Sequence, residues 1–294
     1  MKTPLPVANR VDARFGIIIP ACNEAVCLAS VLAELRTVLT DTNRFVFSVG
    51  VNGSTDGTAC VAAESGAVVG ETGKRGYGHG CKAGIDALAA NGLEVDAYIF
   101  FAADGANDPR DIPALIREYE QGADLVIGSR TRRIENWRAM NLHYVATNLL
   151  FGTCVGLLTG RFYTDLGPLR LIESDLFRTM GMQEWTFGWT IEAQVRAAMA
   201  GATSREIPVR ERERVAGEQK VSRVSSLHSA RIGLAILRAG CRARFRGEAE
   251  IAGHSLFGNR NTSPHAPRET TVDSAIQGRL ESGKAARSRF PQKT

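Results

Sequence analysis

Three polar side chains come shortly after runs of β-branched and aromatic residues, at points where strands would end. They are Glu24 after 16–19, Asn52 after 45–51 and Asp104 after 97–101. Carboxylate and amide oxygens accept hydrogen bonds from sugar hydroxyls and base edges. Lys74 lies in a glycine-rich segment, G-K-R-G-Y-G-H-G (73–80), whose backbone N–H groups suit an anion. These residue types together predict a site for a ligand with an anionic group and polar ring edges.

The elements that must position these residues follow from the hydrophobic patterning. From Phe15 onward, short β-branched runs alternate with helical patterns, which is typical of βαβ units and a mostly parallel sheet. The predicted strands are 16–19, 45–51, 67–70, 97–101, 125–128 and 205–209; the predicted helices are 24–39, 56–64, 77–90, 113–121, 141–158, 190–200 and 225–244. Such sheets bind ligands at the carboxyl ends of their strands, so the loops after Ile19, Val51 and Phe101 are expected to meet. The stretch 160–171 contains Gly and Pro, and no helix or strand is predicted within it.

Composition limits the class of protein. The chain has 294 residues, of which 44% are hydrophobic, enough for one large α/β domain with a buried core. Its most apolar stretch, 146–158, is shorter than the roughly 18 residues that span a bilayer. Six cysteines occur without a C-x-x-C pair, which argues against a zinc ribbon or a disulfide scaffold. Because the start lacks a signal-peptide pattern, we expect a cytoplasmic protein.

The net charge of +5 is concentrated in one segment. Residues 205–246 carry eleven Lys or Arg against four Asp or Glu, whereas residues 1–204 carry 18 against 22. The basic segment lacks interleaved aromatic residues, which argues against a nucleic-acid partner. Its predicted helix, 225–244, mixes apolar residues with arginines and suits peripheral contact with an anionic membrane surface. Packing on the domain as an ordinary amphipathic helix is the alternative.

Three strand-end motifs together resemble family 2 glycosyltransferases, which have the GT-A fold. Residues 17–24 read I-I-I-P-A-C-N-E, similar to P-A-Y-N-E, and residues 51–58 read V-N-G-S-T-D-G-T, similar to D-D-G-S-x-D-G-T. Residues 100–109 read F-F-A-A-D-G-A-N-D-P, similar to the D-A-D-G-x-x-D-P form of the DxD motif. The resemblance implies a Rossmann-like α/β fold, a mostly parallel sheet flanked by helices in a single domain. It also implies a nucleoside-diphosphate-sugar donor, UDP- or GDP-linked.

The same resemblance implies a role for each matching position. The implied donor-binding residues are Pro20, Cys22, Glu24, Asn52, Lys74, Ala103, Asp104 and Arg130. Asp104 and Asp108 are the implied ligands of Mg²⁺ or Mn²⁺, which would neutralise the departing diphosphate. The chain has Ala102 where the motif has its first aspartate. A metal-independent or weakly active enzyme supported by Lys or Arg is therefore an alternative, as is a non-catalytic nucleotide-sugar-binding protein.

Four motifs in the second half resemble the polyprenyl-phosphate branch of the family, which includes bacterial enzymes similar to dolichyl-phosphate mannose synthase. They read Y-T-D-L-G-P-L-R (163–170), F-G-W-T-I-E (187–192), E-I-P-V (206–209) and R-E-R-V-A-G-E-Q-K (212–220). This resemblance implies inverting transfer of a hexose to a polyprenyl or dolichyl phosphate at the inner face of a membrane. The implied catalytic residues are Asp165, Glu192, Arg214 and Lys220.

The resemblance also divides the chain. Residues 1–13 are expected to be an N-terminal extension, and 14–246 the GT-A domain, with a donor half at 14–133 and an acceptor half at 134–246. The remaining residues, 247–294, are rich in polar residues, proline and glycine, and are expected to form a disordered basic tail.

Several of these residues also have a purely structural interpretation. Glu24 suits a helix N-terminus, Asp165 can brace the Gly-Pro turn that follows it, and Glu192 can pair with Arg196 one helical turn later. The alternating R-E-R-E-R run, 210–214, is typical of a solvated strand edge before its last arginine. A glycan hydroxyl is the alternative acceptor, and Glu192 would then act as a general base.

Overall fold

A computed structural model describes residues 10–140, 142–186, 188–214 and 234–245. All of them belong to one compact unit, Met1–Ala252, and a second unit, Gly253–Thr294, lies outside the described residues. Lys220 and the expected tail at 247–294 also lie outside them, so both expectations stay predictions.

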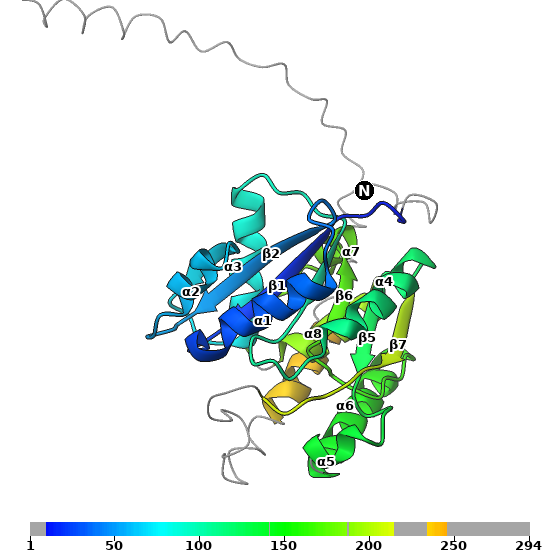
Figure 1. Ribbon diagram of the computed structural model, residues 1–294. Helices are drawn as coiled ribbons and strands as arrows, with labels where there is room; N and C mark the ends of the chain where they lie inside the picture. The colour runs from blue at the N-terminus through cyan, green and yellow to red at the C-terminus, as the bar shows by residue number, and fades with distance from the viewer. Residues whose placement is uncertain (1–9, 141, 187, 215–233, 246–294) are drawn as a thin grey trace, which may run out of the picture. The chain divides into compact units, whose positions relative to one another are not determined.

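Strands and helices alternate along the chain (Figure 1). The strands are β1 (Phe15–Ala21), β2 (Phe45–Asn52), β3 (Val68–Thr72), β4 (Ala97–Phe100), β5 (Leu125–Ser129), β6 (Arg170–Glu173) and β7 (Ser204–Pro208). The helices are α1 (Ala25–Val38), α2 (Thr58–Glu64), α3 (Tyr77–Ala90), α4 (Ile112–Glu120), α5 (Asn136–Met140), α6 (Leu142–Thr159), α7 (Ser174–Met180) and α8 (Trp189–Met199), with a 3₁₀ turn, η2, at Pro109–Asp111. Residues 234–245 are also helical. The elements predicted from patterning are present with small shifts at their ends, except that only 234–244 of the predicted helix 225–244 falls within the described residues.

The strands form one sheet in the order β3-β2-β1-β4-β6-β5-β7. Neighbouring strands are parallel except where β6 pairs with β4 and β5. The predicted mostly parallel sheet is confirmed. No strand was predicted at the end of 160–171, where β6 begins. Arg170–Glu173 is a strand because it fills the position between β4 and β5 and pairs its backbone groups on both sides.

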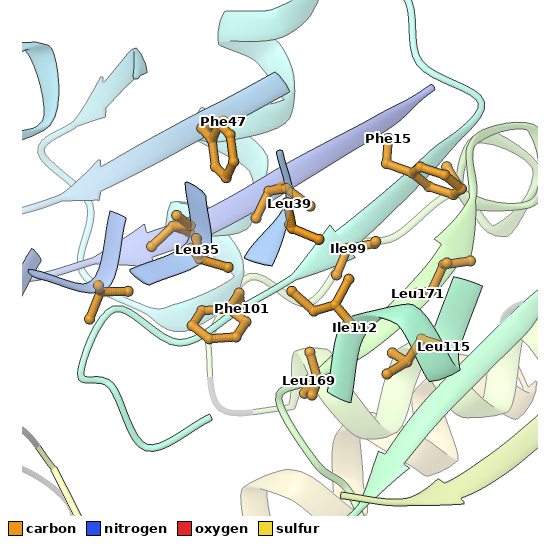
Figure 2. Close-up of a cluster of buried hydrophobic side chains, with 14 of the residues drawn as sticks. Phe15, Leu35, Leu39, Phe47, Ile99, Phe101, Ile112, Leu115, Leu169 and Leu171 are labelled. Atoms are coloured by element: carbon orange, nitrogen blue, oxygen red, sulfur yellow. The ribbon is translucent and has the colours of Figure 1, made fainter. Parts of the chain in front are cut away.

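One face of the sheet packs against α1, α2 and α4. Phe15, Ile17 and Ile19 of β1 point to this face and are fully buried, because side chains alternate across a strand. Figure 2 shows Leu35 of α1 and Ile112 of α4 within the same apolar cluster. This packing holds the carboxyl ends of β1 and β4 in a fixed arrangement.

The other face packs against α3, α6, α7 and α8. Trp189 is fully buried there, with its ring centroid 4.8 Å from that of Phe100. A Cβ on Gly50 of β2 would lie 1.8 Å from the carbonyl oxygen of Gly80 in α3, so only glycine permits this approach. The close contact brings the start of α3 next to Asn52 at the end of β2.

Helix α6 is apolar and only partly buried. It contains no Asp, Glu, Lys or Arg, and 28% of its 18 residues are buried. By length and composition alone it could cross a membrane, a test that the core helix of a soluble protein also passes. The expectation that this stretch is too short for a bilayer is therefore wrong, because the helix continues beyond 146–158 at both ends.

Candidate active site

The loops that carry the predicted site residues meet at one edge of the sheet. Every strand except β6 ends at this edge, and β6 begins there. The loops at the edge are 22–24, 53–57, 73–76, 101–108, 130–135, 160–169 and 209–214. The prediction that the loops after β1, β2 and β4 come together is confirmed.

The loops after β1 and β2 hold each other in place. Asn23 adopts a left-handed conformation with φ 55°, which asparagine tolerates. Its Oδ1 accepts a hydrogen bond from the Thr55 N–H at 2.7 Å, and its own N–H donates to Ser54 Oγ at 3.0 Å. The Glu24 N–H donates to Thr58 Oγ1 at 3.0 Å. These bonds fix the start of α1, where Glu24 stands.

The predicted donor-binding residues of this edge differ in exposure. Lys74 is exposed, Cys22 and Glu24 are partly exposed, and Pro20, Asn52 and Ala103 are buried. The Asn52 Nδ2 donates to the carbonyl oxygen of Gly76 at 2.9 Å. Asn52 therefore ties β2 to the segment before α3, and its contact with a nucleotide base stays a prediction.

The DxD-like loop presents one accessible carboxylate. Asp104 is 25% exposed, and its Oδ1 accepts from a backbone N–H of its own loop. Asp108 has no exposed surface, and both of its oxygens accept from the Arg110 guanidinium at 2.7 to 3.1 Å. Burial raises the pKa of Asp108, but the hydrogen bonds from Arg110 lower it more, so the pKa lies below its ordinary value. Asn107 is also fully buried, and its Nδ2 has no hydrogen-bond partner within the described ranges.

The segment after β7, residues 209–214, lies along the DxD-like loop, and we call it the arginine arm (Figure 1). Its backbone is bonded to that loop, since Arg212 N–H donates to the Ala106 carbonyl oxygen at 2.8 Å. Its three arginines pair with carboxylates of other elements: Arg210 with Asp111 at 2.9 Å, Arg212 with Glu34 at 2.7 Å and Arg214 with Glu24 at 2.9 Å. The expected solvated strand edge is instead an anchored segment.

Glu211 of the arm joins a second ionic cluster. Arg130 Nη1 lies 3.4 Å from Glu211, while Arg130 Nε and Nη2 donate to the two oxygens of Asp165 at 2.9 and 3.0 Å. Burial raises the pKa of Glu211 to about 7 against the opposing effect of Arg130, and the charge of Asp165 raises it further. Asp165 has no exposed surface. The contacts therefore support its interpretation as a brace, and the catalytic role of Asp165 and phosphate binding by Arg130 stay predictions.

Glu192 belongs to a third, closed cluster. Its side chain is 3% exposed and accepts from the N–H groups of Gln183 and Glu184 at 3.1 and 2.7 Å. It also accepts from Arg196 Nε at 2.8 Å, which confirms the predicted pair one helical turn away. Glu192 holds the segment before α8, and this geometry gives no support to its predicted role as a general base.

The residues around Asp104 do not fit a divalent cation. Nowhere in the part of the chain that the structure describes do three His, Cys, Asp or Glu side chains come close enough to hold one. Asp108 is occupied by Arg110. Arg214 Nε lies 3.7 Å from Asp104 Oδ2, and its Nη2 donates to both oxygens of Glu24 at 2.9 and 3.0 Å. A guanidinium thus takes the place between the carboxylates that a hard cation would need, and the predicted Mg²⁺ or Mn²⁺ ligation gains no support from these side chains.

Residues 16–198, which include the loops after β1, β2 and β4, match the profile described as Glycosyl transferase family 2. The chain belongs to glycosyl transferase family 2. An uncharacterized glycosyltransferase of Mycobacterium bovis is 33% identical to it over 217 residues, which cover 70% of this chain and 88% of that protein. A dolichyl-phosphate hexose transferase of Haloferax volcanii is 30% identical over 237 residues, which cover 79% of this chain and 96% of that protein.

A solved structure has the same fold as this family 2 glycosyltransferase. Glucosyl-3-phosphoglycerate synthase of Mycobacterium tuberculosis, in complex with Mg²⁺ and UDP, is 17% identical, with a TM-score of 0.57 over 83% of this chain and 85% of that chain. The likeness shows the GT-A fold, and the predicted fold class is confirmed. The predicted enzyme class, a glycosyltransferase, is confirmed by the family.

The structure of this family 2 glycosyltransferase brings some predicted residues together and separates others. Glu24, Asp104 and Arg214 share one cluster, whereas Glu192 belongs to the cluster around Arg196. Sequence reasoning missed Glu211. The alternation of Arg and Glu in the arm contained a signal for it, because an extended segment presents alternate residues to opposite sides. Only the fold shows which charged side chains the residues on each side of the arginine arm contact.

Proposed function

We propose that this protein is an inverting glycosyltransferase that moves a hexose from a UDP- or GDP-sugar to the phosphate of a polyprenyl lipid. The observation that carries the proposal is an apolar stripe on α6, formed by Leu142, Leu149, Leu150 and Leu157. These side chains are between 40% and 77% exposed and recur at seven- and eight-residue spacing, which places them on one helix face. Exposed apolar surface of this kind marks a membrane or partner contact.

The stripe belongs to the helix that borders the candidate active site. Loop 160–169 packs along α6, since Asn148 Oδ1 accepts from the Leu166 N–H at 3.3 Å and a Cβ on Gly152 would lie 1.9 Å from the Tyr163 carbonyl oxygen. A bilayer against the stripe would therefore bring a lipid phosphate close to the carboxyl edge. The dolichyl-phosphate hexose transferase relative supports the same class of acceptor.

Positive charge follows the stripe along the chain. Arg161 comes just after α6, and Phe162 beside it is 64% exposed. Cationic and aromatic side chains next to an apolar face suit an anionic lipid surface. We therefore propose that the protein lies in the cytoplasm, in peripheral contact with the inner face of the membrane. The proposed contact is made by α6 and not by the predicted helix 225–244.

A phosphate acceptor fits the carboxylates of the site. An oxygen of the ionised phosphate attacks the anomeric carbon from the side opposite the diphosphate, a new C–O bond forms, and the old one breaks with its electron pair left on the diphosphate. The configuration at the anomeric carbon inverts, and no proton needs to leave the acceptor. A glycan hydroxyl would need a base, and the oxygens of Glu192 are already bonded to Gln183, Glu184 and Arg196.

The test is transfer assayed with undecaprenyl phosphate in anionic vesicles and a panel of UDP- and GDP-hexoses. We expect a lipid-linked hexose and release of the nucleoside diphosphate. A Leu149→Glu/Leu150→Glu variant should lose vesicle co-sedimentation and roughly tenfold of its turnover, because two charges would enter the interface. Val26→Glu is the control, since Val26 of α1 is 81% exposed and apolar but lies outside the stripe. Transfer to a soluble glycan hydroxyl, with none to the lipid, would contradict the proposal.

A further inference from the structure

The guanidinium of Arg214 has hydrogen-bonding capacity left over. Its Nη2 donates to both oxygens of Glu24, while Nε is buried without a hydrogen-bond partner among the residues that the structure describes. Asp104 Oδ2, 3.7 Å from Nε, attracts it electrostatically but is too distant for a hydrogen bond. Unpaired buried donors are rare in native proteins because they lose hydration without compensation. Arg214 therefore has an unpaired N–H group on the side of Asp104. The nucleotide sugar is proposed to bind on this side.

The backbone of the arginine arm sets this position. Val209 N–H donates to the carbonyl oxygen of Ser129 at 3.1 Å, which continues the pairing of β7 with β5. Arg212 N–H then donates to the carbonyl oxygen of Ala106 at 2.8 Å. Arg214 follows two residues later, so its position depends on an anchored backbone as well as on its own ion pair.

The charges around Arg214 match a diphosphate only if the arginine is included. Glu24 and Asp104 are both acidic, and a nucleoside diphosphate beside them would be repelled without a cation. Ala102 supplies no ligand atom, and Asp108 is bonded through both oxygens to Arg110. A guanidinium presents several N–H groups in one plane and binds phosphate oxygens in pairs.

We propose that Arg214 takes the place of a divalent cation in binding the diphosphate of the donor, with Glu24 and Asp104 positioning its guanidinium. The inference rests on the proposed function, because its ligand is a nucleoside diphosphate. During transfer the bond between the anomeric carbon and the β-phosphate oxygen breaks, and the electron pair stays on that oxygen. Arg214 stabilises the developing charge by hydrogen bonding.

Calorimetric titration of UDP and GDP into the full chain tests this inference, once with excess EDTA and once with Mn²⁺. We expect the dissociation constant of the bound nucleotide to differ by less than about threefold between the two conditions. Arg214→Met should weaken binding in EDTA by roughly tenfold or more, because a charge-assisted hydrogen bond is lost. Arg214→Lys keeps the positive charge but lacks the planar guanidinium. Its nucleotide affinity in EDTA should lie between that of the unmodified chain and that of Arg214→Met.

The matched control is Arg44→Met. Arg44 forms a partly buried ion pair with Glu120 at 3.1 Å, and it stands just before β2, at the opposite edge of the sheet. This variant should bind nucleotide like the unmodified chain. Melting temperatures of all variants, measured without nucleotide, separate loss of binding from loss of folding.

Two results would overturn the inference: binding that tightens tenfold or more with Mn²⁺ and disappears in EDTA, or unchanged binding by Arg214→Met in EDTA. Binding seen only with Mn²⁺ would reject the role of Arg214 and leave the proposed glycosyl transfer intact. If neither UDP nor GDP binds under either condition, the donor assignment of the proposed function fails as well.

Discussion

Two carboxylate–guanidinium clusters of this protein have the same chemical groups and opposite construction. The side chains of Glu192 and Arg196 are 3% and 7% exposed, and each is also bonded to a neighbouring backbone group. The Glu24–Arg214–Asp104 cluster is 12%, 17% and 25% exposed, and Arg214 Nε has no hydrogen-bond partner in the described ranges. Full hydrogen bonding indicates a structural brace, whereas a partly exposed cluster with an unpaired hydrogen-bond donor indicates a binding site. Residue type alone does not distinguish them.

The largest effect on stability is expected from breaking the closed cluster. Glu192→Gln removes the charge of a buried carboxylate that is paired with the buried Arg196, which should lower the free energy of unfolding by about 3 kcal/mol. Urea denaturation measures this loss, and nucleotide affinity of the folded fraction should be unchanged. A loss below about 1 kcal/mol would show that the cluster is not the brace that its contacts suggest.

The second effect is a pH dependence from Glu211, whose side chain is 16% exposed, within the range of the Glu24–Arg214–Asp104 cluster. Because burial raises its pKa from 4.5 to about 7, the folded protein keeps a proton on Glu211 in that interval while the unfolded chain has released it. Stability from this group is therefore complete below about pH 4.5 and is lost as the pH rises through about 7. The expected size is at most about 3 kcal/mol, since one pKa unit corresponds to about 1.4 kcal/mol.

Glu211→Gln is the variant that isolates this dependence. Urea denaturation of both proteins between about pH 5 and 7.5 should show a steeper fall for the unmodified chain than for the variant, because glutamine does not titrate. Parallel pH profiles would mean that Glu211 is already ionised in the folded protein, paired with Arg130.

A third, smaller effect is expected from weakening the partly exposed Glu24–Arg214–Asp104 cluster. Glu24→Gln removes one charge from a pair that is partly exposed, so the free energy of unfolding should fall by about 1 kcal/mol, roughly a third of the loss for Glu192→Gln. The same urea denaturation measures it. Equal losses for the two variants would remove the distinction between brace and binding site.

The smallest effect is expected from an ion pair that has neither burial nor additional partners. Lys82 and Asp86 of α3 have the same four-residue spacing as Glu192 and Arg196, but their side chains are 48% and 59% exposed. Asp86→Ala should change the free energy of unfolding by less than about 0.5 kcal/mol. A loss near that of Glu192→Gln would show that spacing, rather than burial, sets the strength of such pairs.

The elements that sequence reasoning predicted well are those with strong local patterns. Phe15–Ala21 and Ala25–Val38 follow from a β-branched run and a helical period, and both were predicted with small shifts at their ends. β6 was missed because four residues after a Gly-Pro turn have no periodicity of their own, and their pairing with β4 and β5 makes them a strand. The predicted helix 141–158 agrees with α6, Leu142–Thr159, within one residue at each end.

The candidate site shows the same limit. The motifs around Glu24 and Asp104 identified the family, and the comparisons confirm it. The partners of their carboxylates could not be predicted, since Arg214 is 190 residues from Glu24 in the chain and meets it only through the arm. Asp108 matches the family motif by position. In the local turn η2, however, both of its carboxylate oxygens accept hydrogen bonds from Arg110.

By itself, the sequence determined the class of fold, the edge of the sheet where the site lies and the family. Each depends on local information: periodicity, strand-end residues and short motifs. Only the tertiary structure decided which charges are satisfied, because burial and pairing depend on segments distant in the chain. It placed Glu192 in a closed cluster and Asp165 beneath Arg130, and it left a donor of Arg214 unpaired beside Asp104. The physical reason is that burying a polar group without a hydrogen-bond partner costs free energy, so a paired group and an unpaired one differ in stability.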